Sequence, residues 1–333
     1  VVDGRIEYVG PAAEMPAGQP FETVLDAGGA LAMPGFVNAH THIPMTLFRS
    51  IANDVPLQQW LNERIWPLED KLNGDMVYWG TLLGAAEMLA AGVTSFAEMY
   101  FFMEDIARAT EKSGMRACLY RAVLGQEDDG GRLDEAEAFH ARWNGAAEGR
   151  ILTGIAPHAE YTCSPRVLTA CLERAAKLNC GLHIHVSETE SEHVACKERH
   201  GGKSPVGLLD DLHLLDVPCL LAHGVWLEAE DMARIAQKGA VLAHCRYDGG
   251  AGDGWSCQQQ QFRCMAGDVF GSRTPKGTIS GCDSSFRRPG PQNGYPERGC
   301  RRWSARRVRQ AFGRTACRYH IGGHRPAALL AGQ

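Results

Sequence analysis

Histidines recur at the ends of short apolar segments in the first three quarters of the chain. His40 and His42 stand two residues apart at the end of the segment "PGFVNAHTH". Four more histidines each close a later segment of the same kind: His158, His185, His223 and His244. In a strand, residues i and i+2 point to the same face, so the imidazoles of His40 and His42 can reach one ion. The recurrence of histidine at one position of a repeating unit predicts a metal site.

A metal site beside a carboxylate is suited to hydrolysis. A divalent ion held by neutral imidazoles lowers the pKa of its bound water to about 7. Glu188 follows His185 by three residues, so it can act beside the ion and carry a proton to a leaving group or a ring nitrogen. His223 can hold the attacking oxygen or stabilise developing charge. Such a set hydrolyses C–N or C–Cl bonds on electron-poor rings, or amides. Since a single histidine at a strand end is more often structural, the prediction depends on the recurrence.

The apolar segments have the length and composition of buried strands. They are "PGFVNAHTH", "VTSFAEMY", "RACLYRAV", "ILTGIAPHAE", "CGLHIHVSE", "PCLLAHGVWL" and "AVLAHC". Between them, stretches such as "EDIARATEKSG" place apolar residues three and four apart, as amphipathic helices do. Gly114 and Gly181 stand where two of these helices are predicted to end. Alternating strands and helices predict a parallel sheet, here a (β/α)8 barrel that lacks one strand, with its chemistry at the carboxyl ends of the strands.

The charge distribution divides the chain in two. Residues 1–245 carry a net charge of −15, whereas residues 246–333 carry +10 and contain 14 Arg but few Leu, Ile, Val or Phe. Such a tail is too poor in apolar residues for a packed domain. At the other end, Asp3-Gly4 in "VVDGRIEYVG" predicts a hairpin turn. We therefore predict three parts: a partial β-sandwich domain (1–33), the barrel with strands 1–7 (34–245) and an aberrant, disordered tail (246–333).

The segments "PGFVNAHTHIPM", "PHAEYTCSP", "HIHVSETESE" and "LAHGVWL" resemble the amidohydrolase superfamily. The similarity extends over residues 1 to about 245 and is greatest to the 5-methylthioadenosine/S-adenosylhomocysteine deaminases, with the triazine hydrolases as relatives. It implies a (β/α)8 TIM barrel with a small β-sandwich. The segment "VVDGRIEYVGPAAEM" is similar to the N-terminal part of that sandwich. It also implies a hydrolase acting on C–N bonds other than peptide bonds, a cyclic amidine deaminase.

The resemblance implies a role for each matching position. His40, His42 and His185 would bind Zn²⁺, or another divalent ion such as Fe²⁺ or Mn²⁺. Glu188 would transfer protons and His223 would assist the hydroxide. The implied substrate-binding residues are Trp60 and Glu69 at the ring and ribose, Arg121 and Arg132 at a carboxylate-bearing tail, and His158 at the purine. Trp60 could equally be one face of an amphipathic helix, and an arginine after a glycine-rich loop such as "DDGGRL" is otherwise most often solvated.

One implied ligand is missing. The resemblance implies an aspartate in a Thr-Asp-Gly context at the end of an eighth strand, and no such motif occurs in this chain. Asp253 lies too few residues after Cys245 to end an eighth strand, because a parallel crossover takes at least about 10–12 residues. Asp283 has no strand before it. The genetic code permits a coding sequence for Ala251–Gln261 that, read one base later, encodes Leu-Gly-Thr-Asp-Gly-Ala-Ala-Ser-Asn-Asn. This shifted reading contains the missing Thr-Asp-Gly motif. We therefore interpret the chain from about Arg246 as a frameshifted reading, which impairs both folding and activity.

These features predict an aminohydrolase that deaminates an adenosine-type nucleoside, impaired in this chain. An alternative is a related triazine chlorohydrolase or guanine-type deaminase. A non-enzymatic alternative is a nucleic-acid binder that uses the basic cluster "RRWSARRVR" (301–309); we rank it low, since a shifted frame explains that basicity without function. A cytoplasmic location is expected from twelve cysteines without a signal peptide. No apolar run predicts a membrane span. Intact family members would be homo-oligomers.

Overall fold

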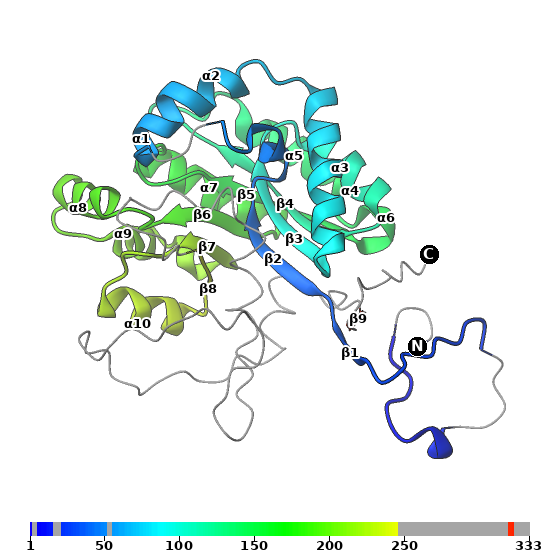
Figure 1. Ribbon diagram of the computed structural model, residues 1–333. Helices are drawn as coiled ribbons and strands as arrows, with labels where there is room; N and C mark the ends of the chain where they lie inside the picture. The colour runs from blue at the N-terminus through cyan, green and yellow to red at the C-terminus, as the bar shows by residue number, and fades with distance from the viewer. Residues whose placement is uncertain (2–4, 16–20, 52–54, 246–318, 323–333) are drawn as a thin grey trace.

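The computed structural model describes residues 1, 5–15, 21–51, 55–245 and 319–322 (Figure 1). Seven strands form one parallel sheet in the order in which they occur along the chain. They are β2 (Phe36–Thr41), β3 (Val93–Tyr100), β4 (Arg116–Val123), β5 (Ile151–Pro157), β6 (Leu182–Val186), β7 (Cys219–His223) and β8 (Val241–His244). The sheet curves almost into a barrel, which confirms the predicted incomplete (β/α)8 fold.

The connecting helices cover the outside of the sheet (Figure 1). The longer ones are α3 (Gly74–Ala90), α4 (Met103–Ser113), α5 (Arg132–Trp143), α7 (Pro165–Leu178), α8 (Glu190–Arg199) and α10 (Ala229–Lys238). The shorter ones are α1 (Leu57–Gln59), α2 (Trp66–Glu69), α6 (Ala146–Gly149) and α9 (Pro205–Asp211). Four further turns are η1 (Ala12–Glu14), η2 (Ile43–Phe48), the π-helical η3 (Trp60–Ile65) and η4 (Leu214–Asp216). No helix in the described part of the chain is long and apolar enough to cross a membrane.

Two glycines predicted to end helices differ in outcome. Gly114 ends α4 in the left-handed conformation (φ 74°), as predicted. The prediction at Gly181 is wrong, because α7 ends at Leu178 and Asn179 takes the left-handed position (φ 50°). Asparagine tolerates this conformation more readily than most residues with a side chain. Gly181 has another reason to lack a side chain, since a Cβ there would lie 3.0 Å from the carbonyl oxygen of Pro218.

The hydrophobic core consists mainly of two clusters between the sheet and its helices. One joins β3 and β4 to α3, α4 and α5 around Phe96, Ile106 and Leu119. The other joins β5, β6 and β7 to α7 and α9 around Leu168, Ile184 and Leu221. Every residue of β7 is buried, whereas Val241 and Leu242 of β8 are only half-buried. Strand β8 has a neighbour on one side only among the described residues, which explains the difference.

The predicted N-terminal half-sandwich (1–33) stays a prediction, because the described residues cover only part of that segment. Residues 5–15 and 21–30 contribute an isolated bridge at Arg5 and the short turn η1, and most of them are exposed. Strand β1 (Leu31–Pro34) pairs antiparallel with β9 (Tyr319–Gly322) in a two-stranded sheet. The predicted turn at Asp3-Gly4 lies outside the described residues.

The predictions for the basic tail also fall mostly outside the described residues. Of residues 246–333, the structure describes only the four of β9. The frameshift, the excluded Asp253 and Asp283, and the basic cluster at 301–309 all lie in the part that is left undescribed. They therefore stay predictions.

Candidate metal centre and active site

Three histidines converge at the carboxyl ends of β2 and β6. His40 lies on β2, His42 follows that strand directly, and His185 lies on β6. One ring nitrogen of each lies within 4.8 Å of those of the other two, and the residues are 1 %, 9 % and 2 % exposed. The parallel sheet brings them together because the carboxyl ends of its strands meet at one mouth.

The hydrogen bonds of two of these rings fix which nitrogen is free. His42 Nδ1 bonds to the carbonyl oxygen of Met99 at 2.5 Å, and His185 Nδ1 bonds to that of His158 at 2.8 Å. A carbonyl oxygen only accepts, so Nδ1 carries the proton in both neutral rings and Nε2 presents a lone pair. The two Nε2 atoms lie 3.2 Å apart. Lone pairs that face each other at this distance repel, and a cation held by both would remove the repulsion.

The third ring completes the same pattern. His40 Nδ1 lies 3.0 Å from His183 Nε2, whereas His40 Nε2 is buried with no hydrogen-bond partner in the described chain. Three imidazole nitrogens without protein donors suit zinc, which catalytic sites often bind through three protein ligands. The carbonyl partners on Nδ1 correspond to the outer hydrogen bonds that orient metal-binding histidines. The residues present therefore fit the metal that the sequence predicts.

Burial keeps these rings neutral, which is the state that binds a metal. It lowers the pKa of His42 to about 4, while the bond to Met99 acts in the opposite direction. The pKa values of His40 and His185 lie well below the usual value, mainly because of burial and then because of neighbouring histidines. A cation therefore displaces no proton from these rings at neutral pH.

Glu188 and His223 lie beside each other at the same mouth. Glu188 Oε2 lies 3.5 Å from His223 Nε2, and the two residues are 3 % and 0 % exposed. The distance would suit an ion pair, but burial raises the pKa of Glu188 well above its usual value and lowers that of His223 to about 3. Both directions favour a neutral pair. A buried carboxyl group whose pKa is raised can both accept and return a proton, which suits it to proton transfer.

The backbone at His223 is strained. Its φ is 72°, in the left-handed region that a residue with a side chain rarely adopts. Such conformations cost on the order of 1–3 kcal/mol and cluster at functional sites. The carbonyl oxygen of His223 accepts hydrogen bonds from the backbone N–H of Cys245 and from His244 Nδ1. His244, predicted from its place at a strand end, is thus a support for His223.

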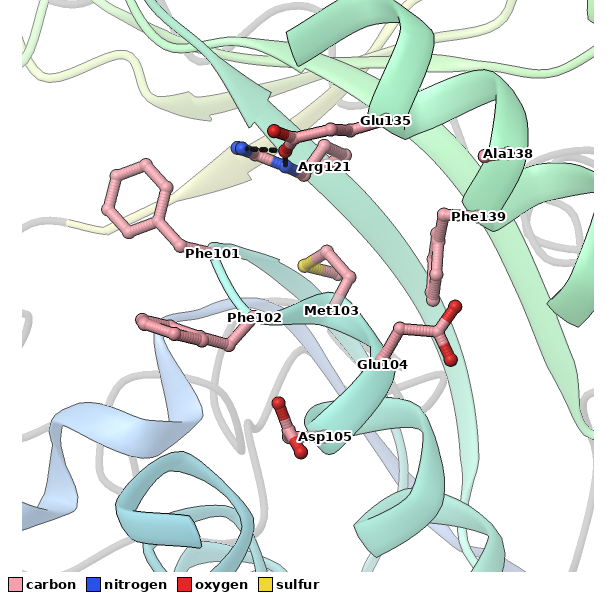
Figure 2. Close-up of a pocket in the computed structure, with 9 residues that line it drawn as sticks. All are labelled: Phe101, Phe102, Met103, Glu104, Asp105, Arg121, Glu135, Ala138 and Phe139. Atoms are coloured by element: carbon pink, nitrogen blue, oxygen red, sulfur yellow. Dashed lines mark hydrogen bonds and ion pairs between the residues drawn. The ribbon is translucent and has the colours of Figure 1, made fainter. Parts of the chain in front are cut away.

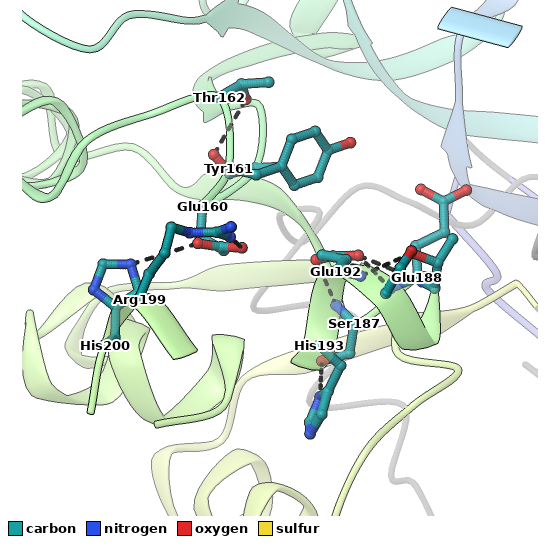
Figure 3. A network of polar contacts seen from close by, with 12 residues as sticks. Glu160, Tyr161, Thr162, Ser187, Glu188, Glu192, His193, Arg199 and His200 are labelled. Atoms are coloured by element: carbon teal, nitrogen blue, oxygen red, sulfur yellow. Dashed lines mark hydrogen bonds and ion pairs between the residues drawn. The ribbon is translucent and has the colours of Figure 1, made fainter. Parts of the chain in front are cut away.

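Three buried polar residues near the mouth were not predicted. His183, which contacts His40, belongs to the sequence "HIH" and repeats the spacing of His40 and His42, so the same signal could have identified it. Glu98 accepts a hydrogen bond from the backbone N–H of Ile43 at 2.8 Å. Glu192 accepts bonds from the N–H groups of three consecutive residues, Ser187 to Thr189, and so fixes the turn that carries Glu188 (Figure 3). A carboxylate inside an apolar strand, as at Glu98, also indicates a functional position and could have been identified from the sequence.

Two predicted substrate-binding residues lie beside the metal centre. His158 contacts His185 directly, and Glu69 is linked to His42 through Tyr100. The His158 and His185 rings have centroids 4.7 Å apart, and His158 Nδ1 bonds to Thr162 Oγ1. Glu69 Oε1 accepts a hydrogen bond from the Tyr100 hydroxyl at 2.5 Å, and the Tyr100 and His42 ring centroids are 6.2 Å apart. Burial raises the pKa of Glu69.

Trp60 occupies a different environment. It is 2 % exposed and belongs to a hydrophobic cluster with Phe48, Leu57, Leu61 and Ile65. This corresponds to the helix-face alternative. Contact between its ring and a substrate would require η3 to move.

Arg121 lines a pocket of about 500 Å³ that α4 and α5 border (Figure 2), whereas Arg132 is not among the residues that line it. Arg121, on β4, donates from Nε and Nη2 to Glu135 Oε2, at 3.0 and 2.5 Å. Its guanidinium also lies 5.6 Å from the centre of the Phe101 ring. Arg132 instead donates to the carbonyl oxygens of Leu124 and Asp129. Arg121 is thus already paired with an internal carboxylate.

Comparisons with known proteins agree with this geometry. The chain belongs to the amidohydrolase family, whose pattern matches residues 31–249. It is 48 % identical over 244 residues to a 5-methylthioadenosine/S-adenosylhomocysteine deaminase of Moorella thermoacetica, covering 73 % of this chain and 57 % of the relative. It is 44 % identical over 247 residues to a 5'-deoxyadenosine deaminase of Methanosarcina mazei, covering 73 % and 56 %. The chain thus spans a little over half the length of these relatives.

Solved structures show the same fold. A zinc-bound adenosine deaminase from Xanthomonas campestris matches with a TM-score of 0.61 and 33 % identity, over 65 % of this chain and 50 % of that one. A zinc complex of atrazine chlorohydrolase from Arthrobacter aurescens matches with a TM-score of 0.58 at 20 % identity, over 65 % and 54 %. The second likeness supports the fold alone.

Proposed function

We propose that this chain is a metal-dependent aminohydrolase acting on an adenosine-type nucleoside such as 5-methylthioadenosine or S-adenosylhomocysteine. The names of the relatives and the zinc in the Xanthomonas structure support this proposal. The observation that carries it is the pair of Nε2 lone pairs, on His42 and His185, that face each other at 3.2 Å. We assign His40, His42 and His185 as ligands of Zn²⁺ or another divalent transition metal.

Each remaining residue has a role that its surroundings support. A bound divalent ion supplies Lewis-acid activation of water near neutral pH. Glu188 accepts a proton from the attacking water at its carboxylate and returns it to the purine ring or the departing amine, which leaves as ammonia. His223, 3.5 Å from Glu188, directs Nε2 toward the oxygen that enters. His158 orients the purine beside His185, and Glu69 binds the ribose hydroxyls.

The arginines define the substrate tail in this proposal. Arg121 and Arg132 hold the carboxylate of an amino-acid tail, and for Arg121 that carboxylate has to displace Glu135. Trp60 closes over the substrate if η3 moves. Homo-oligomer formation and a cytoplasmic location stay predictions.

Turnover by the chain as it stands is expected to be low. The described residues supply three imidazoles and no carboxylate ligand to the centre, and β8 has no partner strand on its outer side among them. We therefore expect metal and nucleoside to bind more readily than the nucleoside is converted.

The test is ammonia release from 5-methylthioadenosine by the zinc-loaded full chain. Slow release that depends on Glu188 is expected. Turnover near the roughly 10 s⁻¹ of an ordinary enzyme would contradict the impairment. Failure of the chain to bind 5-methylthioadenosine in a calorimetric titration would contradict the function.

A further inference from the structure

A second group of potential metal ligands lies at the C-terminal end of helix α8. Cys196 and His200 are four residues apart, so they share one face of α8, whose last turn ends with His200 as its cap. Glu160 reaches the same point from the turn between β5 and α7. The three ligand atoms lie within 4.8 Å of one another. Cys196 is fully buried and Glu160 is 4 % exposed.

The two oxygens of Glu160 have different surroundings (Figure 3). Oε1 accepts a hydrogen bond from Arg199 at 2.5 Å. Oε2 is buried without a hydrogen-bond partner among the described residues, and His200 Nε2 lies 3.6 Å away, beyond hydrogen-bond distance. A buried carboxylate oxygen normally has a partner. Here the groups beside it are an imidazole nitrogen and a thiol, and a cation could join all three.

From this geometry we infer that Glu160, Cys196 and His200 form a second cation site suited to Zn²⁺. Sulfur and imidazole ligands together select zinc over calcium or magnesium, and three protein ligands leave a fourth position for water. Arg199 does not compete for the ion, because it binds Oε1 and leaves Oε2 to act as a single ligand. Arg199 is also 45 % exposed, so its charge is partly screened by solvent.

Metal binding at this site requires the Cys196 thiol to lose its proton. Burial and the neighbouring Glu160 raise the pKa of Cys196 to about 12. Binding releases this thiol proton to solvent while the sulfur bonds to the metal as a thiolate. The positive charge of the ion replaces the proton beside Glu160.

A metal here would stabilise the surroundings of the first centre. It would join the last turn of α8 to the turn that begins at His158, whose ring contacts His185. The first turn of α8 follows Glu188. The second site would therefore tie together two segments that carry proposed substrate-binding and catalytic groups.

Titration of the full chain with Co²⁺ tests this inference separately from the proposed function. A Co²⁺–thiolate bond gives a charge-transfer absorption band in the near ultraviolet, which the sulfur-free histidine centre cannot give. We expect this band to reach its maximum when one Co²⁺ ion per chain is bound at the second site. Cys196→Ser abolishes it, and His200→Ala weakens the affinity by at least about 10-fold.

Cys245→Ser is the matched control. Cys245 is also buried (3 % exposed) and lies near Glu188, so it tests a thiol beside the histidine centre. The band is expected to survive this change. If Cys196→Ser alters the fold by circular dichroism, His200→Ala, at a half-buried position, still decides the case. Absence of the band in the unmodified chain, or equal affinity in the His200→Ala variant, would overturn the inference.

Discussion

The histidine mouth and the adjacent first turn of α8 are both rich in buried polar groups, yet they differ in how those groups are paired. In the turn, Glu192 accepts three backbone N–H bonds and Ser187 Oγ contacts His193, which contacts Glu228 in turn. At the mouth, two Nε2 atoms face each other and His40 Nε2 has no partner in the described chain.

This difference distinguishes the polar groups of the turn, which have a structural role, from those of the mouth, which are free to bind a ligand. A satisfied network stabilises one conformation and has no capacity left for a ligand. Buried polar atoms that lack partners are costly unless something binds them. The pairing of buried polar atoms therefore identifies the binding site better than the presence of histidine does, since His193 and His244 are histidines with structural contacts.

The largest expected effect comes from Glu188, the one carboxyl group of the mouth placed beside His223. Glu188→Gln keeps the shape of the side chain but cannot accept the proton of the attacking water. Ammonia release should fall by about 10²–10⁴-fold with the metal content unchanged. Glu190→Gln, an exposed position at the start of the same helix, is the control. Equal loss in both variants would mean that the two glutamates do not differ in role.

Removal of a ligand should instead abolish metal binding at the mouth. His42→Ala leaves two imidazoles, and we expect Zn²⁺ affinity at this centre to fall by more than the about 10–100-fold typical of changes to outer-shell partners. Equilibrium dialysis with metal analysis measures this, and the Co²⁺–thiolate band of the second site should persist. His213→Ala, at an exposed residue, should bind metal normally.

Glu192 should affect stability. Glu192→Ala leaves three backbone N–H groups without their acceptor and should lower the free energy of unfolding by about 1–3 kcal/mol in urea denaturation. The exposed Glu198→Ala should change it little. If Glu192→Ala lowered the free energy of Zn²⁺ binding by more than it lowered the free energy of unfolding, the turn would also shape the metal centre.

The pH dependence of this stability has a defined sign. Burial raises the pKa of Glu192 to about 7 in the folded chain, from 4.5. A raised pKa means that the folded state favours the protonated form, so this contribution is complete below pH 4.5 and is lost as the pH rises through about 7. Stability of the unmodified chain relative to Glu192→Gln should therefore decline over that interval. A difference that does not vary with pH would contradict the raised pKa.

The smallest effect concerns substrate choice. Glu135→Gln weakens the contact that occupies Arg121, and Glu135 is 61 % exposed, so the pair is worth no more than about 0.2–1 kcal/mol. The affinity for S-adenosylhomocysteine relative to 5-methylthioadenosine should rise by about 1.5- to 5-fold in calorimetry. Glu137→Gln on the same helix should leave that ratio unchanged. An unchanged ratio in Glu135→Gln would remove Arg121 from the carboxylate-binding role.

The strands could be predicted because each is a short apolar run with a clear end. The segments "VTSFAEMY" and "RACLYRAV" coincide with β3 and β4. The end of α7 was misplaced because asparagine as well as glycine tolerates the left-handed conformation. The half-sandwich stays a prediction, because strand pairing there depends on residues distant in the sequence, and the described residues provide only β9 as a partner for β1.

For the site, sequence spacing predicted which histidines gather, but not how their hydrogen bonds are arranged. His40, His42 and His185 were identified, whereas His183 was overlooked although it lies two residues before His185 on the same strand. The partner of Arg121 could not be predicted either. Glu135 is fourteen residues away, on α5, and only the packing of that helix against β4 brings the two together.

Anomalous X-ray diffraction at the zinc edge, from crystals of the zinc-loaded full chain, locates the metal. We expect an anomalous peak at about 2.0–2.1 Å from the Nε2 atoms of His42 and His185 and from a ring nitrogen of His40. A fully loaded crystal without a peak at these three rings, whatever it showed elsewhere, would contradict the predicted metal centre.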